Sequence, residues 1–229
     1  MQDWRAEVDL WWAAVLRVPV AAVRAGGVFA LGHVDHAGVV VVEGAAAPIV
    51  YGPARVLPAL HAAVQASGGD LAGLATALAP LASRVLGPAW YGYATARTLG
   101  PASGQAVRPL AEADLPLLAA LHERTPPAER EESGTTGLPA CGYLDDGELR
   151  SVACLGVWHE MPTIGVLTDP GARGRGLASM VVTAATREGL SRRSVVQYRA
   201  WRRNTASIKV AVRCGFTHYC DGLVIDLLR

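Results

Sequence analysis

The feature that most constrains this chain is a basic glycine turn, the Arg-Gly-Arg-Gly of residues 173–176, set between a strand pattern and a helix pattern. The apolar run at residues 164–168 predicts a strand, and residues 176–187 carry the spacing of a helix. Glycines let the main chain approach a ligand closely, and the N–H groups at the start of a helix bind anions. The order strand, glycine turn and helix therefore predicts a cradle for a phosphate group.

Two common phosphate loops are excluded by the residues around this turn. No Gly-Lys-Ser or Gly-Lys-Thr follows it, so it is not the P-loop of nucleotide triphosphatases, and the chain lacks the G-x-G-x-x-G dinucleotide fingerprint. The pattern that remains is R-x-x-G-x-A, at Arg173, Gly176 and Ala178. After a strand, this pattern closely resembles the pyrophosphate-binding motif of the GNAT superfamily, the acyl-CoA-dependent N-acyltransferases.

Two further motifs carry the same resemblance in the expected order. Asn204 and Ser207, followed by Gly215-Phe216, resemble the next helix of the superfamily, N-x-x-S with a terminal Gly-Phe. Residues 107–115 resemble its first strand and the start of its first helix. The resemblance therefore covers residues 105–229.

The resemblance implies an α/β chain with the GNAT fold, in which helices flank a central twisted mixed sheet. A smaller α/β region precedes it at residues 1–104, and Gly100-Pro101-Ala102-Ser103-Gly104 is the best linker in the sequence. This N-terminal region matches no motif. By analogy alone, we interpret it as a degenerate GNAT half or as a cap on the acceptor site.

In the superfamily, the fourth and fifth strands of the sheet separate and the pantetheine arm of acetyl-CoA lies between them. The pyrophosphate rests on N–H groups of the cradle, and Asn204 is both a strong N-cap residue and the match of a coenzyme contact. The resemblance thus implies a coenzyme site made of a strand edge, the cradle and the last helix. Its members are Val166, Leu167, Thr168, Arg173, Gly174, Arg175, Gly176, Leu177, Ala178, Asn204 and Ser207.

The implied chemistry is direct attack of an amine on the acetyl thioester, with a general base, a general acid and an N–H donor for the oxyanion. The backbone N–H of Leu167 is the predicted oxyanion donor. Two residues depart from the pattern of the superfamily, because Ala211 stands where many members have a tyrosine acid and Thr163 where many have a glutamate base. His159 and Glu160 are the nearest replacements by sequence. More distant candidates are Tyr143, Tyr198, His218 and Tyr219.

Composition limits where such a chain works and what it binds. No apolar run reaches the roughly 18 residues that span a bilayer, and the first residues do not form a secretory signal. The four cysteines form no C-x-x-C pair, so neither a metal site nor a disulfide is expected. These observations favour a cytoplasmic protein without a metal or a membrane partner.

The net charge of +1 hides an uneven distribution of charged residues. Residues 173–213 hold ten basic side chains and one acidic one, whereas residues 112–160 hold ten acidic and three basic ones. A basic segment suits the phosphates of coenzyme A, and an acidic segment suits a cationic acceptor. Both segments also have a simpler interpretation as solvated faces of helices and loops.

Taken together, the motifs favour an N-acetyltransferase that moves an acetyl group from acetyl-CoA to a primary amine. We favour a small-molecule acceptor over the alternative, a peptide or protein N-terminus. A non-catalytic acyl-CoA sensor remains an alternative because of Ala211 and Thr163. A nucleic-acid-binding or ribosome-associated role through the arginines of residues 187–203 is disfavoured, since no recognisable nucleic-acid motif is present. A homodimer remains open.

Periodicity and turn residues predict the remaining elements. Helices are expected at residues 1–18, 19–27, 54–67, 71–86, 113–124 and 204–214. Strands are expected at residues 28–33, 39–43, 48–51, 90–94, 105–110, 140–144, 149–158, 163–168, 195–201, 217–219 and 223–228. A polar loop is expected at residues 125–137, and a hairpin turn at residues 145–147.

Overall fold

The computed structural model describes residues 3–31, 38–43, 48–101 and 107–228, and its chain divides into two compact units. The first unit consists of residues 1–91, 201–203 and 219–229, and the second of residues 92–200 and 204–218. The expected boundary at residue 104 lies outside the described residues, as do the linker residues 102–104 and the ends of the strands expected at 28–33 and 105–110. The roles predicted for the two regions stay predictions.

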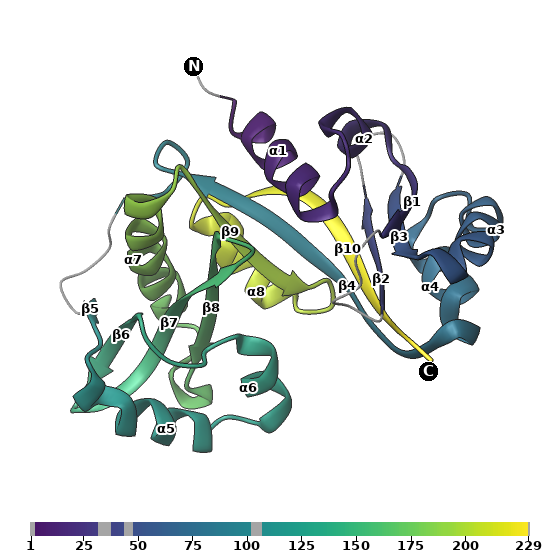
Figure 1. Ribbon diagram of the computed structural model, residues 1–229. Coiled ribbons are helices and arrows are strands. Elements are labelled where there is room, and N and C mark those ends of the chain that lie inside the picture. The colour runs from purple at the N-terminus through teal and green to yellow at the C-terminus, as the bar shows by residue number, and fades with distance from the viewer. Residues whose placement is uncertain (1–2, 32–37, 44–47, 102–106, 229) are drawn as a thin grey trace. The chain divides into compact units, whose positions relative to one another are not determined.

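The first unit is a mixed sheet packed against short helices (Figure 1). Its strand order is β1-β3-β2-β10-β4, with β1 parallel to β3 and with β2 antiparallel to both β3 and β10. The described helices are α1 (Trp4–Leu16), α2 (Val20–Ala25), η1 (Ala54–Val56), α3 (Leu57–Ser67), α4 (Leu71–Leu78) and η2 (Ala79–Leu81). The strands are β1 (Gly27–Leu31), β2 (Gly38–Glu43), β3 (Pro48–Pro53), β4 (Ala82–Thr95) and β10 (Thr217–Leu227).

Helices α3 and α4 close one face of this sheet. Leu60, Leu74 and Leu78 are fully buried against Val50 and Ile225 of the strands. Asp70 caps α4 by accepting a hydrogen bond from the N–H of Gly73 at 2.8 Å. The first unit therefore has a hydrophobic core of its own.

The second unit is a sheet of strand order β9-β8-β7-β6-β5, in which neighbours are antiparallel except for β8 and β9. Its strands are β5 (Val107–Pro109), β6 (Ala140–Asp145), β7 (Glu148–Trp158), β8 (Met161–Thr168) and β9 (Val195–Trp201). Its helices are η3 (Glu112–Asp114), α5 (Leu115–Glu123), α6 (Pro127–Ser133), η4 (Pro170–Ala172), α7 (Leu177–Arg192) and α8 (Thr205–Arg213). Strands β4, β9 and β10 each have residues in both units.

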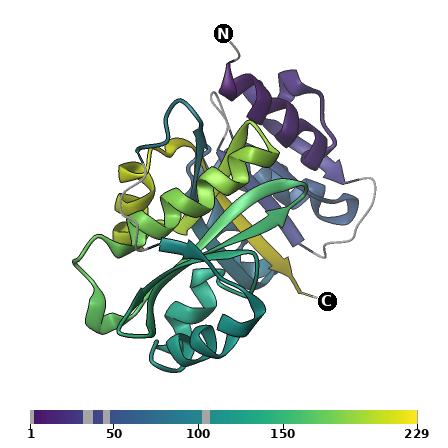
Figure 2. The ribbon, with the colours of Figure 1, turned by 90° about the vertical axis from the view of Figure 1, so that its left-hand side faces the viewer.

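Helices cover both faces of this second sheet. Leu121 of α5 packs with Val152 and Leu167, which project from one face of β7 and β8. Helix α7 packs against the opposite face of β6, β7 and β8, and Figure 2 shows it crossing those strands. Its Gly189 lies so close to Leu155 and Val196 that a Cβ there would come within 3.1 Å and 2.7 Å of them. The predicted α/β fold, a mixed sheet flanked by helices, is confirmed.

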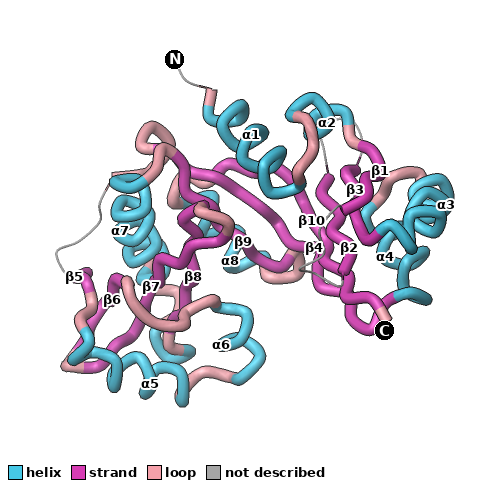
Figure 3. Tube along the Cα trace, in the orientation of Figure 1, coloured by secondary structure: helices cyan, strands magenta, loops and turns pink. Residues whose placement is uncertain are grey.

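Most of the expected elements are present, and three differ (Figure 3). The helix expected at residues 71–86 ends at Leu78, and residues 82–86 begin the long strand β4, because Pro80 cannot continue a helix. The expected loop at 125–137 contains α6, which runs from Pro127 to Ser133 and is capped by Gly134 in the left-handed conformation. The two strands expected after residue 217 are the single strand β10.

Candidate active site

The cradle between β8 and α7 is built from main chain. Gly174 and Gly176 have φ angles of 79° and 78°, a left-handed conformation that favours glycine. A Cβ added at either glycine would meet no described atom within 4 Å, so the space above the turn is open. Within the described chain, no side chain caps the start of α7 at Gly176. The first N–H groups of this helix are therefore available to an anion.

Strands β8 and β9 are neighbours over a short distance only. Their parallel register covers two residue pairs, Thr163 with Gln197 and Ile164 with Tyr198, although the strands contain eight and seven residues. Beyond Ile164, β8 continues toward the cradle without register partners on β9 among the described residues. Val166 and Thr168 are accordingly half-buried rather than buried, in a strand that lies inside the sheet.

The direction of the N–H groups along β8 follows from one hydrogen bond. The N–H of Asp169 donates to the carbonyl of Arg150 across the β7–β8 ladder at 2.9 Å. Because N–H groups alternate sides along a strand, Leu167 also directs its N–H toward β7. Val166 and Thr168 direct theirs to the open side, where the ladder with β9 has ended.

Helix α8 places the second motif beside β9, at the position where β9 pairs with β8. The side chain of Asn204 caps α8, since its Oδ1 accepts a hydrogen bond from the N–H of Ser207 at 3.0 Å. The Oγ of Ser207 lies 2.8 Å from the phenolic oxygen of Tyr198 on β9. Tyr198 is the last residue of β9 that pairs with β8. The strand edge, the cradle and the N-x-x-S helix therefore belong to one compact unit.

A family model described as an acetyltransferase (GNAT) domain matches residues 144–217, which run from the end of β6 to the start of β10. Residues 144–217 therefore match the GNAT acetyltransferase family. The matched segment contains β8, the cradle, β9 and α8, so the predicted family is confirmed.

Solved structures show the same fold. The chain is similar to an acetyltransferase of the GNAT family from Colwellia psychrerythraea, with 15% identity, a TM-score of 0.50, and 70% of this chain and 63% of that chain covered. A GCN5-related N-acetyltransferase from Sphaerobacter thermophilus is similar over 69% of this chain and 56% of its own, with 16% identity and a TM-score of 0.50. The chain thus spans less than two thirds of the length of either structure. No curated protein sequence matches it.

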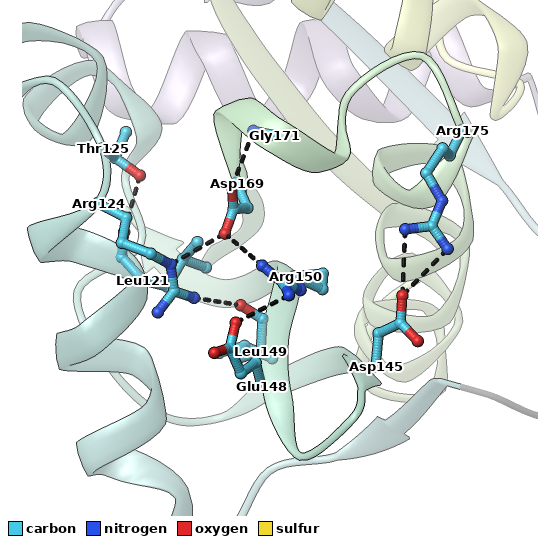
Figure 4. A network of polar contacts seen from close by, with 10 residues as sticks. All are labelled: Leu121, Arg124, Thr125, Asp145, Glu148, Leu149, Arg150, Asp169, Gly171 and Arg175. Carbon is cyan, nitrogen blue, oxygen red and sulfur yellow. Dashed lines mark hydrogen bonds and ion pairs between the residues drawn. The ribbon is translucent and has the colours of Figure 1, made fainter.

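A buried carboxylate, Asp169, lies at the start of the cradle (Figure 4). Asp169 is 5% exposed, and it accepts hydrogen bonds from Nε of Arg124 at 2.9 Å, from Arg150 at 3.2 Å and from the N–H of Gly171 at 2.9 Å. Burial raises the pKa of Asp169, but the Gly171 amide and the two arginines outweigh it and leave that pKa lowered. Asp169 therefore stays ionised and joins α5, β7 and the start of the cradle. Sequence reasoning missed it, although it directly follows the predicted strand.

Both arginines of the cradle carry carboxylate partners. Arg173 pairs with Glu129 of α6, and Arg175 pairs through both terminal nitrogens with Asp145 at 3.1 Å. All four side chains are between 38% and 50% exposed, so each pair is worth little in water. These acids lie in the segment expected to face a cationic acceptor, and they contact the cradle instead.

The loop after α6 rests directly on β8. A Cβ added at Gly165 would lie 2.5 Å from the carbonyl carbon and oxygen of Gly134. Such a contact is closer than real Cβ atoms show, so only glycine fits at this position. Sequence reasoning missed this contact because the loop and the strand are far apart in the chain.

The cradle, Asn204 and Ser207 lie in the same unit, but His159 and Glu160 lie at the far end of β8 from the cradle. These two residues form the turn between β7 and β8, both with positive φ, at the end of β8 opposite the cradle. Glu160 is paired with Arg193 at 2.9 Å, and its side chain is 85% exposed. Their predicted catalytic roles stay predictions. The amide of Leu167, the predicted oxyanion donor, faces β7 rather than the open edge.

The other polar candidates have separate surroundings. Tyr219 belongs to the first unit, where its hydroxyl donates to buried Asp9 at 2.7 Å. Tyr143 lies on β6, paired in register with Ser151. Ala211, at the usual acid position, is fully buried, and Thr163, at the usual base position, lies opposite Gln197.

The described residues also bear on membrane spans and metal sites. Over these ranges, no helix combines the length and the apolar character needed to cross a membrane. In the same residues, histidine, cysteine, aspartate and glutamate side chains do not gather in groups of three or more suited to a metal ion. A cavity of about 550 Å³ is lined by residues of β5, β6 and α7, including Val107, Cys141 and Ala185, and none of the cradle residues line it.

Proposed function

We propose that this protein is an N-acetyltransferase that moves the acetyl group of acetyl-CoA directly to the primary amine of a small molecule. One observation carries the proposal. Among the described residues, the β8–β9 register ends at Ile164, and β8 continues from there to the open cradle at the start of α7 with the N–H groups of Val166 and Thr168 directed away from β7. This edge matches an extended arm that carries amides along its length and is joined at one end to a pyrophosphate.

The residues present fit each part of coenzyme A. The N–H of Thr168 suits an amide carbonyl of the pantetheine arm, because it points to the open side of β8. The N–H groups from Gly174 to Ala178 suit the pyrophosphate, helped by the dipole of α7. Arg173 and Arg175 supply positive charge once phosphates replace their present carboxylate partners.

In the proposed reaction, the neutral amine attacks the thioester carbonyl, a C–N bond forms, and the C–S bond then breaks. The negative charge that develops on the carbonyl oxygen needs a positioned N–H donor. The N–H of Val166 fits this task because it lies on the open side of β8 and follows closely after the last paired residue, Ile164. Val166 therefore replaces Leu167 as the proposed oxyanion donor.

Packing on the α5 and α6 face favours a compact acceptor. The loop after α6 touches β8 at Gly165, so the strand is covered there by Ser133 and Gly134. An extended peptide laid along this face would meet that loop. A small amine needs only a gap beside it.

The proposal is tested by titrating the purified protein with acetyl-CoA in a calorimeter, followed by thiol-release assays on a panel of small amines and peptides. Binding with turnover on small amines is the expected result. Turnover on peptides alone would replace the acceptor class, and binding without turnover on either would favour an acyl-CoA sensor. Failure to bind acetyl-CoA would overturn the proposal.

A further inference from the structure

We propose that the hydroxyl of Ser207, held in place by Tyr198, donates a hydrogen bond to the coenzyme sulfur as the C–S bond breaks. This role rests on the proposed acetyl transfer and supplies the stabilisation of the leaving group that Ala211 cannot give. Ser207 is the residue that contacts the sulfur, and Tyr198 is a positioning residue.

Both the main chain and the side chain of Ser207 are fixed. Its N–H donates to Oδ1 of Asn204 at 3.0 Å, which places it in the first turn of α8. Its Oγ lies 2.8 Å from the phenolic oxygen of Tyr198, whose side chain is 1% exposed and packs edge-on against Phe216 at 5.3 Å. A hydroxyl held in this way has little freedom to turn away from a neighbouring ligand.

The pair lies where the sulfur is expected. Tyr198 stands opposite Ile164, at the last position before β8 and β9 part, which is where a thioester laid along β8 would have its reactive end. Ser207 and Ala211 are four residues apart on α8 and so lie on one face of it. Ser207 is half-buried, whereas Ala211 is fully buried. Ser207 therefore still has a side open to a ligand.

The protonation states of Tyr198 and Ser207 suit the donation of a hydrogen bond rather than the transfer of a proton. Burial raises the pKa of Tyr198 well above its usual range, so its phenol stays protonated. When this phenol donates to Oγ of Ser207, the Ser207 proton remains available to another acceptor. Burial also makes Tyr198 a poor source of protons, so we expect it to orient Ser207 and not to ionise.

The departure of the thiolate needs no side chain that gives up its proton. As the tetrahedral intermediate collapses, the electron pair of the C–S bond moves to sulfur, and Ser207 stabilises the thiolate through a hydrogen bond while keeping its proton. The thiolate takes a proton from water after release, and the proton lost by the acceptor nitrogen goes to water. The reaction therefore needs no acid at position 211.

The first experiment measures the thiol pKa of bound coenzyme A from the ultraviolet absorbance of its thiolate. A hydrogen bond to the charged form lowers a pKa, so the bound thiol in wild type should have a pKa about one unit below that in Ser207→Ala or Tyr198→Phe, a tenfold shift. Ser207→Thr keeps a hydroxyl and should restore the lower value. Equal thiol pKa values in all four proteins would overturn the inference.

The matched control is Tyr93→Phe. Tyr93 is also 1% exposed, and its hydroxyl accepts a hydrogen bond from Gln197 at 2.8 Å. Gln197 precedes Tyr198 on β9, so its side chain points to the opposite face of the sheet. Loss of this phenol should lower stability as Tyr198→Phe does, yet leave the thiol pKa unchanged. A shift in Tyr93→Phe equal to that in Tyr198→Phe would overturn the inference, because it would reduce the effect to general loosening.

Kinetic measurements distinguish the role of Ser207 from the proposed acetyl transfer itself. In the amine assay, Ser207→Ala and Tyr198→Phe should each lower kcat about tenfold, with the Kd for acetyl-CoA little changed, and the double variant should lose no more than either single one. Binding without turnover in wild type would refute the proposed reaction, while the thiol titration would still decide whether Ser207 meets the sulfur. Absence of coenzyme binding in wild type would refute both.

Discussion

The cradle after β8 and the Tyr198–Ser207 pair beside β9 are built in opposite ways, although we propose that both bind the same ligand. The cradle consists of main-chain groups with two half-exposed arginines, each paired with a carboxylate that is itself partly exposed. The pair consists of neutral hydroxyls, one of them buried, fixed by contacts between two elements. Exposed charge suits affinity for a mobile anion, whereas a rigid neutral donor suits a reacting atom.

The largest expected effect tests the main-chain nature of the cradle. Gly176→Glu places a side chain and a negative charge in the open space over the turn, so the Kd for acetyl-CoA should rise about a hundredfold or more. The measurement is calorimetric titration, with circular dichroism as the check on folding. A folded variant with near-wild-type affinity would remove the cradle from the site.

The control for this change is Gly176→Ala. Its Cβ meets no described atom within 4 Å, so it adds only the strain of a left-handed residue, about 1 kcal/mol. The difference between the two variants isolates bulk and charge from backbone strain. Equal losses in both variants would show that conformation, rather than access to the phosphate, sets the affinity.

These two regions also differ in how far the sequence predicts them. The cradle is local, since a strand, a glycine turn and a helix start lie within about fifteen residues, and its donors are main-chain groups that any such sequence supplies. The same locality made β6, β7, β8 and the turn at residues 145–147 predictable. Helix α6 was missed because its two prolines and acidic run are typical of a loop as well as of a helix start.

Contacts between distant segments are beyond such reasoning. Asp169 is 45 residues from Arg124 in the chain, and nothing in the strand pattern marks it as buried and shared. Gly165 reads as an ordinary strand glycine until Gly134 is placed against it. The N-x-x-S motif predicted Ser207, but only the fold shows that its hydroxyl meets Tyr198.

Gly165→Ala tests how tightly a third region, the loop after α6, is packed on β8. The new Cβ would overlap the main chain of Gly134, so we expect the free energy of unfolding to fall by about 3 kcal/mol in urea denaturation. Gly156→Ala on β7 is the control, because its Cβ would lie 3.4 Å from Thr163, an ordinary contact. Similar stability of the two variants would mean that the loop yields at little cost.

Asp169→Asn removes the buried negative charge at the start of the cradle, and so tests whether the exposed cradle also depends on buried contacts. Loss of the charged hydrogen bonds to Arg124 and Arg150 should lower the free energy of unfolding by about 2 kcal/mol at neutral pH. The pKa of Asp169 is lowered in the folded protein, so its contribution is complete above about pH 4 and is lost as the pH falls through the folded value.

The gap in unfolding free energy between wild type and Asp169→Asn should therefore narrow as the pH falls below about 4. Urea denaturation at a series of pH values measures this gap. Glu148→Gln is the control, because Glu148 is half-exposed and pairs with Arg150, and this change should cost about 0.5 kcal/mol or less. A gap that stays constant with pH would assign the effect of Asp169→Asn to packing rather than to charge.

The smallest expected effect concerns the exchange of partners at the cradle. Glu129→Gln leaves Arg173 without its carboxylate, so the phosphate no longer competes with an anion, and the Kd for acetyl-CoA should fall about threefold at low salt. The gain should vanish at high salt, because screening weakens the same ion pair in wild type. Titrations at two salt concentrations measure both results. Weaker binding in Glu129→Gln would instead show that α6 supports the cradle through Glu129, so that the exposed region is as dependent on fixed contacts as the buried one.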